Sequence, residues 1–275
     1  MPSFRILLCL LSLFCFFHLL AQDSPPHRQK WEEARVAFEA GDNQTALAAY
    51  HEGLRLCLEQ ADTTYQCLIY AANISGIYHR QGQVERADSI LQTQLKLAQS
   101  APPTRPKLLF YNRLCESLIN LGRLEESYQH NVAILEEASD ETHPKEVGKL
   151  QQNLAKTYLL WGMYDLGDSL YIRLISTEQA REDKRALVVS LTNRARLLER
   201  RGDLQKAADM YQSALEINRE MNRPRGMVIN GNNLGVLLRK QGKNAEALKL
   251  HQELLHEAEQ INFPLAVGYQ HLNIG

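Results

Sequence analysis

Histidine, cysteine and acidic residues are the side chains with which this chain could perform chemistry, and their spacing forms no catalytic or metal-binding pattern. The nine histidines, which include His79 and His251, are scattered along 275 residues. The sequence contains no HExxH or CxxC motif, no glycine-rich phosphate loop and no GxSxG motif. We therefore predict a protein that is not an enzyme and that uses neither a cofactor nor a metal.

Two cysteines have a spacing that favours a covalent bond. Cys57 and Cys67 flank Asp62 almost symmetrically, as partners across a helical hairpin do. In an oxidising compartment their bond would close a loop of about 11 residues and stabilise the fold by about 2.5–3 kcal/mol. The alternative is two separate buried thiols that fill small gaps. Cys115 is expected to be a buried, inert thiol.

Asparagine recurs at a fixed interval, which is the strongest sign of a binding surface. Equivalent positions hold Asn73, Arg113, Asn153, Asn193, Asn233 and Asn273. Asparagine is a mediocre helix former, so its recurrence on helical segments needs a reason. Its amide carries both a donor and an acceptor, which match the peptide bond of an extended ligand. The alternative is a structural ladder, in which each amide caps a neighbouring helix or bonds the next repeat.

Basic residues add charge to the same surface. The predicted peptide-binding cations are Lys156, Arg196 and Arg200, and Glu199 is the main acid near them. We therefore expect a protein or peptide partner in extended form, with an acidic segment or a C-terminal carboxylate favoured. The formal net charge of −1 lacks the basic excess of nucleic-acid binders, so no nucleic acid is expected.

Arg194 differs in type from the residues at the equivalent positions of the other repeats. The equivalent residues are Ile74, Leu114, Leu154 and Leu234, with Glu33 in the atypical first repeat. A buried arginine needs a partner. Arg194 is therefore expected either to bend outward or to mark a site.

A repeat of 40 residues positions all of these side chains. Its markers are six almost equally spaced glycines, Gly41, Gly82, Gly122, Gly162, Gly202 and Gly242. Small residues such as Ala207 recur five positions after each glycine, and others such as Ala195 recur seven positions before it. Two small columns let a pair of helices approach closely, with the glycine in a left-handed turn between them. The predicted helices are 28–40, 43–59, 66–81, 84–99, 107–121, 124–138, 146–161, 164–180, 186–201, 204–221, 227–241 and 244–260.

Aspartates and prolines lie between or after these predicted helices. Asp42 and Asp203 directly follow their glycines, where a side-chain oxygen can cap the next helix. Pro144, Pro224 and Pro264 fall in register and mark the loops between repeats, where a helix cannot continue.

A helix–turn–helix unit with small residues in these columns resembles the tetratricopeptide repeat. The resemblance runs from about Arg28 to Gly275 and is close at Ala207–Tyr211 (AADMY) and Asn233–Leu238 (NLGVLL). It implies an all-α, right-handed superhelical solenoid whose first helices line a concave groove. The usual period is 34 residues, so the longer period is similar to the branch found in kinesin light chains and bacterial peptide-pheromone receptors. The predicted repeats span 28–67, 68–107, 108–147, 148–187, 188–227 and 228–267, with a partial seventh at 268–275.

Two functions are compatible with this resemblance. The first is a non-catalytic scaffold that holds an extended protein or peptide segment in the groove. The second is the N-terminal sensory or scaffolding region of a larger bacterial signalling protein, whose output would be a histidine kinase, a DNA-binding regulator or a protease. The seventh repeat opens at Ala266–Gly275 with an uncovered apolar face. We therefore expect a longer protein, in which a following span would bring contact with a membrane.

Residues 1–21 are predicted to be a signal peptide that precedes a solenoid domain over 22–275. Arg5 supplies a positive flank, and the apolar run Ile6–Leu20 ends at the small residue Ala21. This run is shorter than the roughly 20 residues of a membrane span. A cleaved signal would export the protein to a periplasm or beyond, whereas the alternative is a retained anchor.

Overall fold

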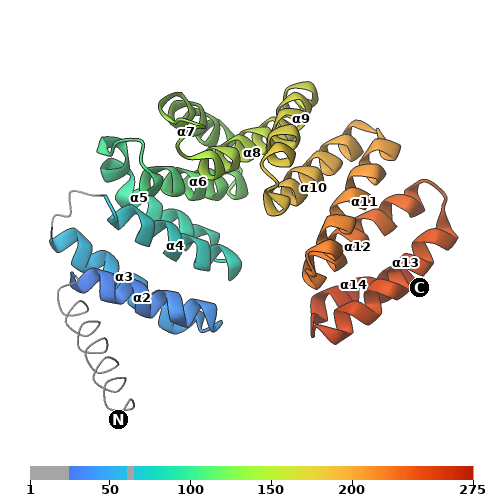
Figure 1. The fold of residues 1–275 in the computed structure, drawn as a ribbon, viewed down its shortest axis with the longest axis horizontal. Coiled ribbons are helices and arrows are strands. Elements are labelled where there is room, and N and C mark those ends of the chain that lie inside the picture. Colours follow the sequence, from blue (N-terminus) through green and yellow to red (C-terminus); the bar gives the residue numbers. More distant parts are fainter. Residues whose placement is uncertain (1–24, 61–64, 275) are drawn as a thin grey trace, which may run out of the picture. The chain divides into compact units, whose positions relative to one another are not determined.

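The computed structural model describes residues 25–60 and 65–274. The predicted signal peptide lies outside the described residues. All regular structure in the described ranges is helical, and it contains no strand (Figure 1). The helices are α2 (Pro26–Glu39), α3 (Asn43–Glu59), α4 (Cys67–Arg80), α5 (Val84–Ser100), α6 (Arg105–Asn120), α7 (Leu124–Glu137), α8 (Pro144–Leu160), α9 (Tyr164–Ala180), α10 (Lys184–Arg201), α11 (Leu204–Glu220), α12 (Pro224–Lys240), α13 (Asn244–Gln260) and α14 (Pro264–Ile274).

The prediction of an all-α repeat fold is confirmed, and the predicted helix ends agree with the structure to within three residues. Even-numbered helices are the first helices of the repeats, and odd-numbered helices are the second. The left-handed turn between them is also confirmed, because the six marker glycines have φ between +73° and +93°. The turns that lead into α10, α12 and α14 contain other left-handed residues, namely Glu182, Asn222 and Asn262.

Two details of how the helices begin differ from the prediction. Pro144, Pro224 and Pro264 lie inside helices, as the first residues of α8, α12 and α14. Proline fits there because the first helical residue needs no amide hydrogen bond and its φ is already helical. Asp42 caps α3 by accepting from Thr45 N at 3.0 Å, but Asp203 makes no cap for α11. Its carboxylate instead accepts from Arg201 Nε at 2.8 Å.

The small residues lie where the two helices of a repeat approach closely. Ala155 on α8 and Ala207 on α11 are completely buried. In the fourth repeat, a Cβ added to Gly167 would lie 2.7 Å from Leu197 Cδ1 and 3.3 Å from the carbonyl oxygen of Ala155. Larger side chains in these columns would therefore separate the helices.

The chain divides into two compact units. Unit 1 comprises residues up to Glu126 together with Glu136–Ala138, and unit 2 comprises Ser127–Leu135 and Ser139 onward. The 40-residue period of the sequence continues through this boundary, so one solenoid domain over 22–275 stays a prediction. Among the described residues, no helix is both long and apolar enough to cross a membrane.

Each unit has its own core. In unit 1, the rings of Trp31, Tyr50 and Tyr70 pack edge to face, with Trp31 5.4 Å from each tyrosine centroid. In unit 2, Tyr171 and Tyr211 are among the largest fully buried side chains. Both tyrosines come from second helices and pack against first helices, whose opposite sides therefore remain available to solvent.

Candidate binding surface

The candidate site is a line of side chains on the solvent-facing side of the first helices of unit 2. Positions i, i+4, i+7 and i+11 share one side of an α-helix because it has 3.6 residues per turn. On α10 these positions are Val189, Asn193, Arg196 and Arg200, and none of the four is buried. On α12 the equivalent residues are Ile229, Asn233, Val236 and Lys240, which are also not buried. We call these eight residues the open stripe.

Residues beside the open stripe join each first helix to the next. Gln152 Nε2 on α8 donates to Ser190 Oγ on α10 at 3.0 Å. Thr192 Oγ1 on α10 donates to Asn230 Oδ1 on α12 at 2.7 Å. Gln270 Nε2 on α14 donates to Asn232 Oδ1 on α12 at 3.3 Å. We call these three pairs the polar seam; they hold the first helices of unit 2 side by side.

Asn193 and Asn233 are half-buried and make no side-chain hydrogen bond with the described residues. Bonding between repeats falls to their seam neighbours Thr192 and Asn232. The structural ladder therefore does not account for these two asparagines. It does describe Asn273, whose Nδ2 donates to Asn232 Oδ1 at 3.1 Å.

The other predicted asparagines have different surroundings. Asn73 belongs to unit 1, and its Nδ2 donates to the carbonyl oxygen of Ile69 on its own helix at 2.8 Å. Asn153 and Lys156 take equivalent positions on α8 of unit 2, and each already interacts within the chain. The structure thus brings together Asn193, Asn233, Arg196 and Arg200, and leaves Asn73 in the other unit.

The cations of the open stripe differ in whether they are neutralised. Lys240 Nζ lies 2.6 Å from Glu199 Oε1 and forms an ion pair with it. Arg196 and Arg200 are exposed and form no ion pair within the described part of the chain. A cation in the last turn of a helix, such as Arg200, also stabilises that helix by interacting favourably with the helix dipole. Arg196 lies a turn earlier, where this explanation does not apply.

Two buried tyrosines interact electrostatically with Arg196. Burial raises the pKa of the Tyr171 hydroxyl, and the positive charge of Arg196 partly offsets that rise. Burial also raises the pKa of Tyr211, with a smaller upward contribution from Glu199 and an opposing one from Arg196. Both phenols therefore stay neutral at physiological pH and leave the charge of Arg196 uncompensated.

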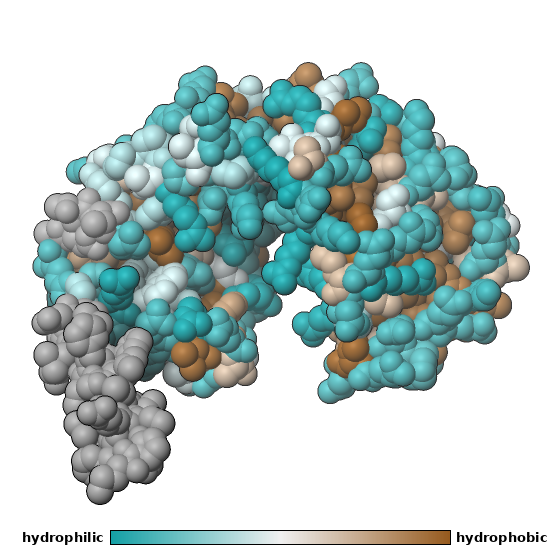
Figure 2. Space-filling view, in the orientation of Figure 1, coloured by the Kyte–Doolittle hydropathy of each residue, from teal (hydrophilic) through white to brown (hydrophobic). Residues whose placement is uncertain are grey.

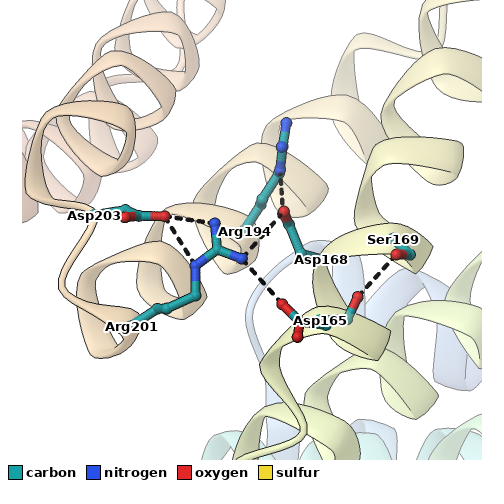
Figure 3. A network of polar contacts seen from close by, with 6 residues as sticks. All are labelled: Asp165, Asp168, Ser169, Arg194, Arg201 and Asp203. Carbon is teal, nitrogen blue, oxygen red and sulfur yellow. Dashed lines mark hydrogen bonds and ion pairs between the residues drawn. The ribbon is translucent and has the colours of Figure 1, made fainter.

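Arg194 does not open a ligand site, because it has an acidic partner on the preceding second helix (Figure 3). Its Nε lies 2.7 Å from Asp168 Oδ1. Arg201 Nη1 approaches the other oxygen of Asp168 at 3.7 Å and Asp165 Oδ1 at 3.5 Å. The sequence offered one signal for this network, which is the aspartate that recurs at the same position of two repeats, as Asp88 and Asp168. In the structure Asp88 also pairs with an arginine, Arg123 of unit 1, at 3.0 Å.

Cys57 and Cys67 form a disulfide that joins α3 to α4, with their Cα atoms 5.6 Å apart. Both residues are buried in the core of unit 1. Cys115 is a buried thiol outside any disulfide. Within the described residues, no three His, Cys, Asp or Glu side chains gather in a way that could hold a metal ion.

Sequence models of the tetratricopeptide repeat match residues 71–103, 190–225 and 232–262. These segments cover parts of both units and include Asn73, Asn193 and Asn233. The chain is a tetratricopeptide-repeat protein. No curated protein sequence matches this repeat protein.

Solved structures with the same fold share little sequence with this tetratricopeptide-repeat protein. A signal-transduction ATPase with a tetratricopeptide repeat sensor from Pyrococcus horikoshii has a TM-score of 0.69 at 17% identity; the match covers 92% of this chain but 38% of that protein. A Rap protein complexed with Competence and Sporulation Factor has a TM-score of 0.64 at 11% identity, covering 91% of this chain and 75% of the other. Bacillus thuringiensis PlcR, in complex with the peptide PapR7 and DNA, has a TM-score of 0.63 at 12% identity and 84% coverage of both chains.

Proposed function

We propose that this protein is a non-catalytic scaffold that binds an extended segment of a partner protein or peptide on the open stripe. One observation carries the proposal: two neighbouring first helices present the amides of Asn193 and Asn233 with no partner among the described residues. The polar seam holds α10 and α12 together, so the two amides belong to one surface.

Hydrogen bonding explains why an extended segment suits this surface. A primary amide offers donors and an acceptor that match the N–H and C=O groups of a backbone without internal hydrogen bonds. Each such bond contributes only about 0.5–1.5 kcal/mol net. Two asparagines therefore give modest affinity that does not depend on the ligand's sequence.

Charge supplies the selectivity. Arg196 and Arg200 have no ion pair within the described residues, whereas Glu199 already neutralises Lys240. A guanidinium can bind a carboxylate through two parallel hydrogen bonds. An acidic side chain or a C-terminal carboxylate is therefore the ligand group that complements these two arginines.

The structural relatives support a protein or peptide ligand. By their own descriptions, the Rap structure contains Competence and Sporulation Factor, and the PlcR structure contains the peptide PapR7 together with DNA. Similarity to the Pyrococcus protein, whose repeat region is called a sensor, favours the second candidate: the chain would then be the sensory region of a larger signalling protein. Export through the predicted signal peptide remains part of the proposal for either function.

The experiment is to capture ligands with the purified chain, identify the bound peptide and measure its affinity by calorimetry. Asn193→Ala combined with Asn233→Ala should weaken binding by about 1–3 kcal/mol. The melting temperature should hardly change, because alanine is the better helix former. Asn73→Ala, which removes an amide bonded to its own helix, is the matched control and should leave binding unchanged.

An opposite pattern would contradict the proposal. If the double variant bound as tightly as the parent but melted earlier, the two asparagines would be structural. The ligand would then lie elsewhere on the repeats.

Charge reversal tests the selectivity separately. Arg196→Glu with Arg200→Glu should change which peptides are captured and should make the remaining binding less sensitive to salt. Arg173→Glu with Lys206→Glu is the control, because these exposed cations lie on the second helices α9 and α11. Equal loss in both variants would mean that only the net charge of the protein matters.

A further inference from the structure

Exposed apolar side chains recur at one position of the first helices in unit 2. Val189, Ile229 and Tyr269 are 44%, 50% and 52% exposed and stand 40 residues apart. Among the exposed large apolar residues of the described chain, no other position of the repeat occurs twice. Single exposed apolar residues are ordinary, but a repeated one needs a reason. We call these three residues the apolar row; Figure 2 shows apolar surface in brown among hydrophilic residues over this unit.

The polar seam holds the apolar row in line. The residue after Val189 is Ser190, which accepts from Gln152 on α8. The residue after Ile229 is Asn230, which accepts from Thr192 on α10. Gln270, after Tyr269, donates to Asn232 on α12. The three apolar side chains therefore stand at equivalent positions of adjoining helices.

The asparagines lie between the apolar row and the arginines. With a rise of 1.5 Å per residue, Asn193 is about 6 Å along the helix from Val189. In the same direction from Val189, Arg196 is about 10 Å away and Arg200 about 16 Å. A chain that crossed the helices with its backbone over the asparagines would have the apolar row on one edge. On the other edge, where it crosses α10, it would meet Arg196 and Arg200, which form no ion pair within the described residues.

We infer, on the basis of the proposed function, that the bound segment carries apolar side chains along one edge and a carboxylate on the other edge, opposite the two arginines of α10. Packed helices lie about 8–10 Å apart. Three residues of a polyproline II chain span about 9 Å, and its side chains point in three directions. The segment therefore presents one apolar residue to each repeat, which is a period of three residues, and at least one acidic residue to the two arginines of α10.

Synthetic peptides test this period. The probe is a labelled nine-residue peptide of three Leu-Ser-Glu triplets, checked to be monomeric. Comparison peptides replace every leucine with serine, replace every glutamate with glutamine, or keep the composition and place the leucines side by side. The triplet peptide should bind about tenfold more tightly than each comparison peptide, because only it fills both edges at once. Equal affinity for the leucine and serine peptides, including no measurable binding of either, would overturn the inference.

Variants of the protein locate the apolar edge. Val189→Gln with Ile229→Gln should remove most of the preference for leucine over serine. Glutamine is a good helix former, so folding should persist and is checked by circular dichroism. Leu166→Gln with Ile172→Gln is the matched control, since these exposed apolar residues lie on the second helix α9 and should leave the preference intact.

The outcomes separate this inference from the proposed function. If the Val189 and Ile229 variant kept the leucine preference while Asn193→Ala with Asn233→Ala weakened binding, the apolar edge would be wrong and the proposed function would stand. If the apolar variant lost the preference and the asparagine variant bound like the parent, the apolar edge would stand and the backbone role of the asparagines would be wrong.

Discussion

The first helices of the two units share a repeat but differ in how their polar groups are used. In unit 1, the Arg80 guanidinium lies 4.1 Å from the Phe38 ring centroid. Arg113 pairs with Glu116 at 2.7 Å and covers Gly76. In unit 2, Arg196 and Arg200 have no such partner within the described residues. Recurrence in the sequence thus identifies a position in the repeat, and the surrounding side chains, on the same helix or on a neighbouring one, decide whether its side chain is available.

The same contrast exists inside the units. Cys57 of unit 1 and Glu178 of unit 2 occupy equivalent positions, sixteen residues after their glycines. Cys57 ties α3 to α4 covalently. Glu178 instead accepts hydrogen bonds from Ser190 at 2.9 Å and from Gln152 at 3.1 Å. Unit 1 is therefore closed by a covalent bond at the point where unit 2 relies on polar contacts.

The largest expected effect is the loss of the disulfide. Cys57→Ser with Cys67→Ser should destabilise unit 1 by about 2.5–3 kcal/mol, because the unfolded chain regains the freedom of a loop of about 11 residues. Hydrogen exchange followed by mass spectrometry should show faster exchange in α2–α6 and unchanged exchange in α8–α14. Equal acceleration in both units would show that they unfold together, and the comparison between them would fail.

Overpacking tests the close helix contact of unit 2. Ala207 is completely buried, so Ala207→Leu should lower the free energy of unfolding by about 1–3 kcal/mol. Ala245→Leu, at an exposed position of α13, is the control and should change it little. A chemical melt of Ala207→Leu with no loss of stability would remove this residue from the helix contact.

The buried acid of unit 2 should make stability depend on pH. Burial raises the pKa of Glu178 above its ordinary 4.5; hydrogen bonds from Ser190 and Gln152 oppose the rise, and the charge of Asp183 adds to it. The folded state therefore holds the proton more tightly than the unfolded state. The contribution of Glu178 is most favourable below about pH 4.5 and falls as the pH rises through the raised folded-state pKa.

Glu178→Gln should remove this dependence. Urea denaturation of parent and variant between about pH 4 and pH 7 measures it. The free energy of unfolding of the variant minus that of the parent should grow with pH and then level off. Glu182→Gln, an exposed neighbour, is the control. Parallel pH curves for parent and Glu178→Gln would show that the carboxylate is not desolvated in the folded state.

The smallest expected effect concerns the partly buried ion pair between Arg194 and Asp168 in unit 2. Unit 1 has Ile74 and Leu114 at the position of Arg194, so Arg194→Leu should cost less than about 1 kcal/mol. Asp168 keeps Arg201 as a neighbour at 3.7 Å. Asp168→Ala is the sharper test, because it leaves Arg194 without its acceptor, and it should cost more than Arg194→Leu. The reverse order in denaturant melts would contradict this assignment.

Much of the fold followed from the sequence because its signals are local. The glycines predicted left-handed turns, since only glycine adopts that conformation without strain. Residues such as Ala155 and Ala207 predicted close helix contacts, because small side chains at a constant interval indicate that the same close approach of two helices recurs in every repeat. Pro144 and Pro224 were assigned to loops, so the starts of α8 and α12 were predicted two and three residues too late. Proline both follows a loop and begins a helix, and the sequence pattern does not separate these two roles.

The candidate site was predictable in part. Register placed Asn193 and Asn233 on one side of neighbouring helices, and the charge pattern singled out Arg196 and Arg200. The partner of Arg194 was not predicted, because Asp168 lies on another helix and the sequence does not show which side chains of two helices come into contact. The apolar row was also overlooked, since Val189, Ile229 and Tyr269 stand out only when their exposure is known.

The sequence by itself determined the helices, the turns and the period, because a repeated pattern of small, apolar and glycine residues leaves few ways to bury its apolar faces. Only the tertiary structure decided which polar groups are satisfied. Asn73 and Asn193 occupy the same position in their repeats, yet Asn73 bonds Ile69 and Asn193 has no partner within the described residues. A side-chain hydrogen bond depends on the distance and direction of its partner, and these are set by the packing of the helices around it.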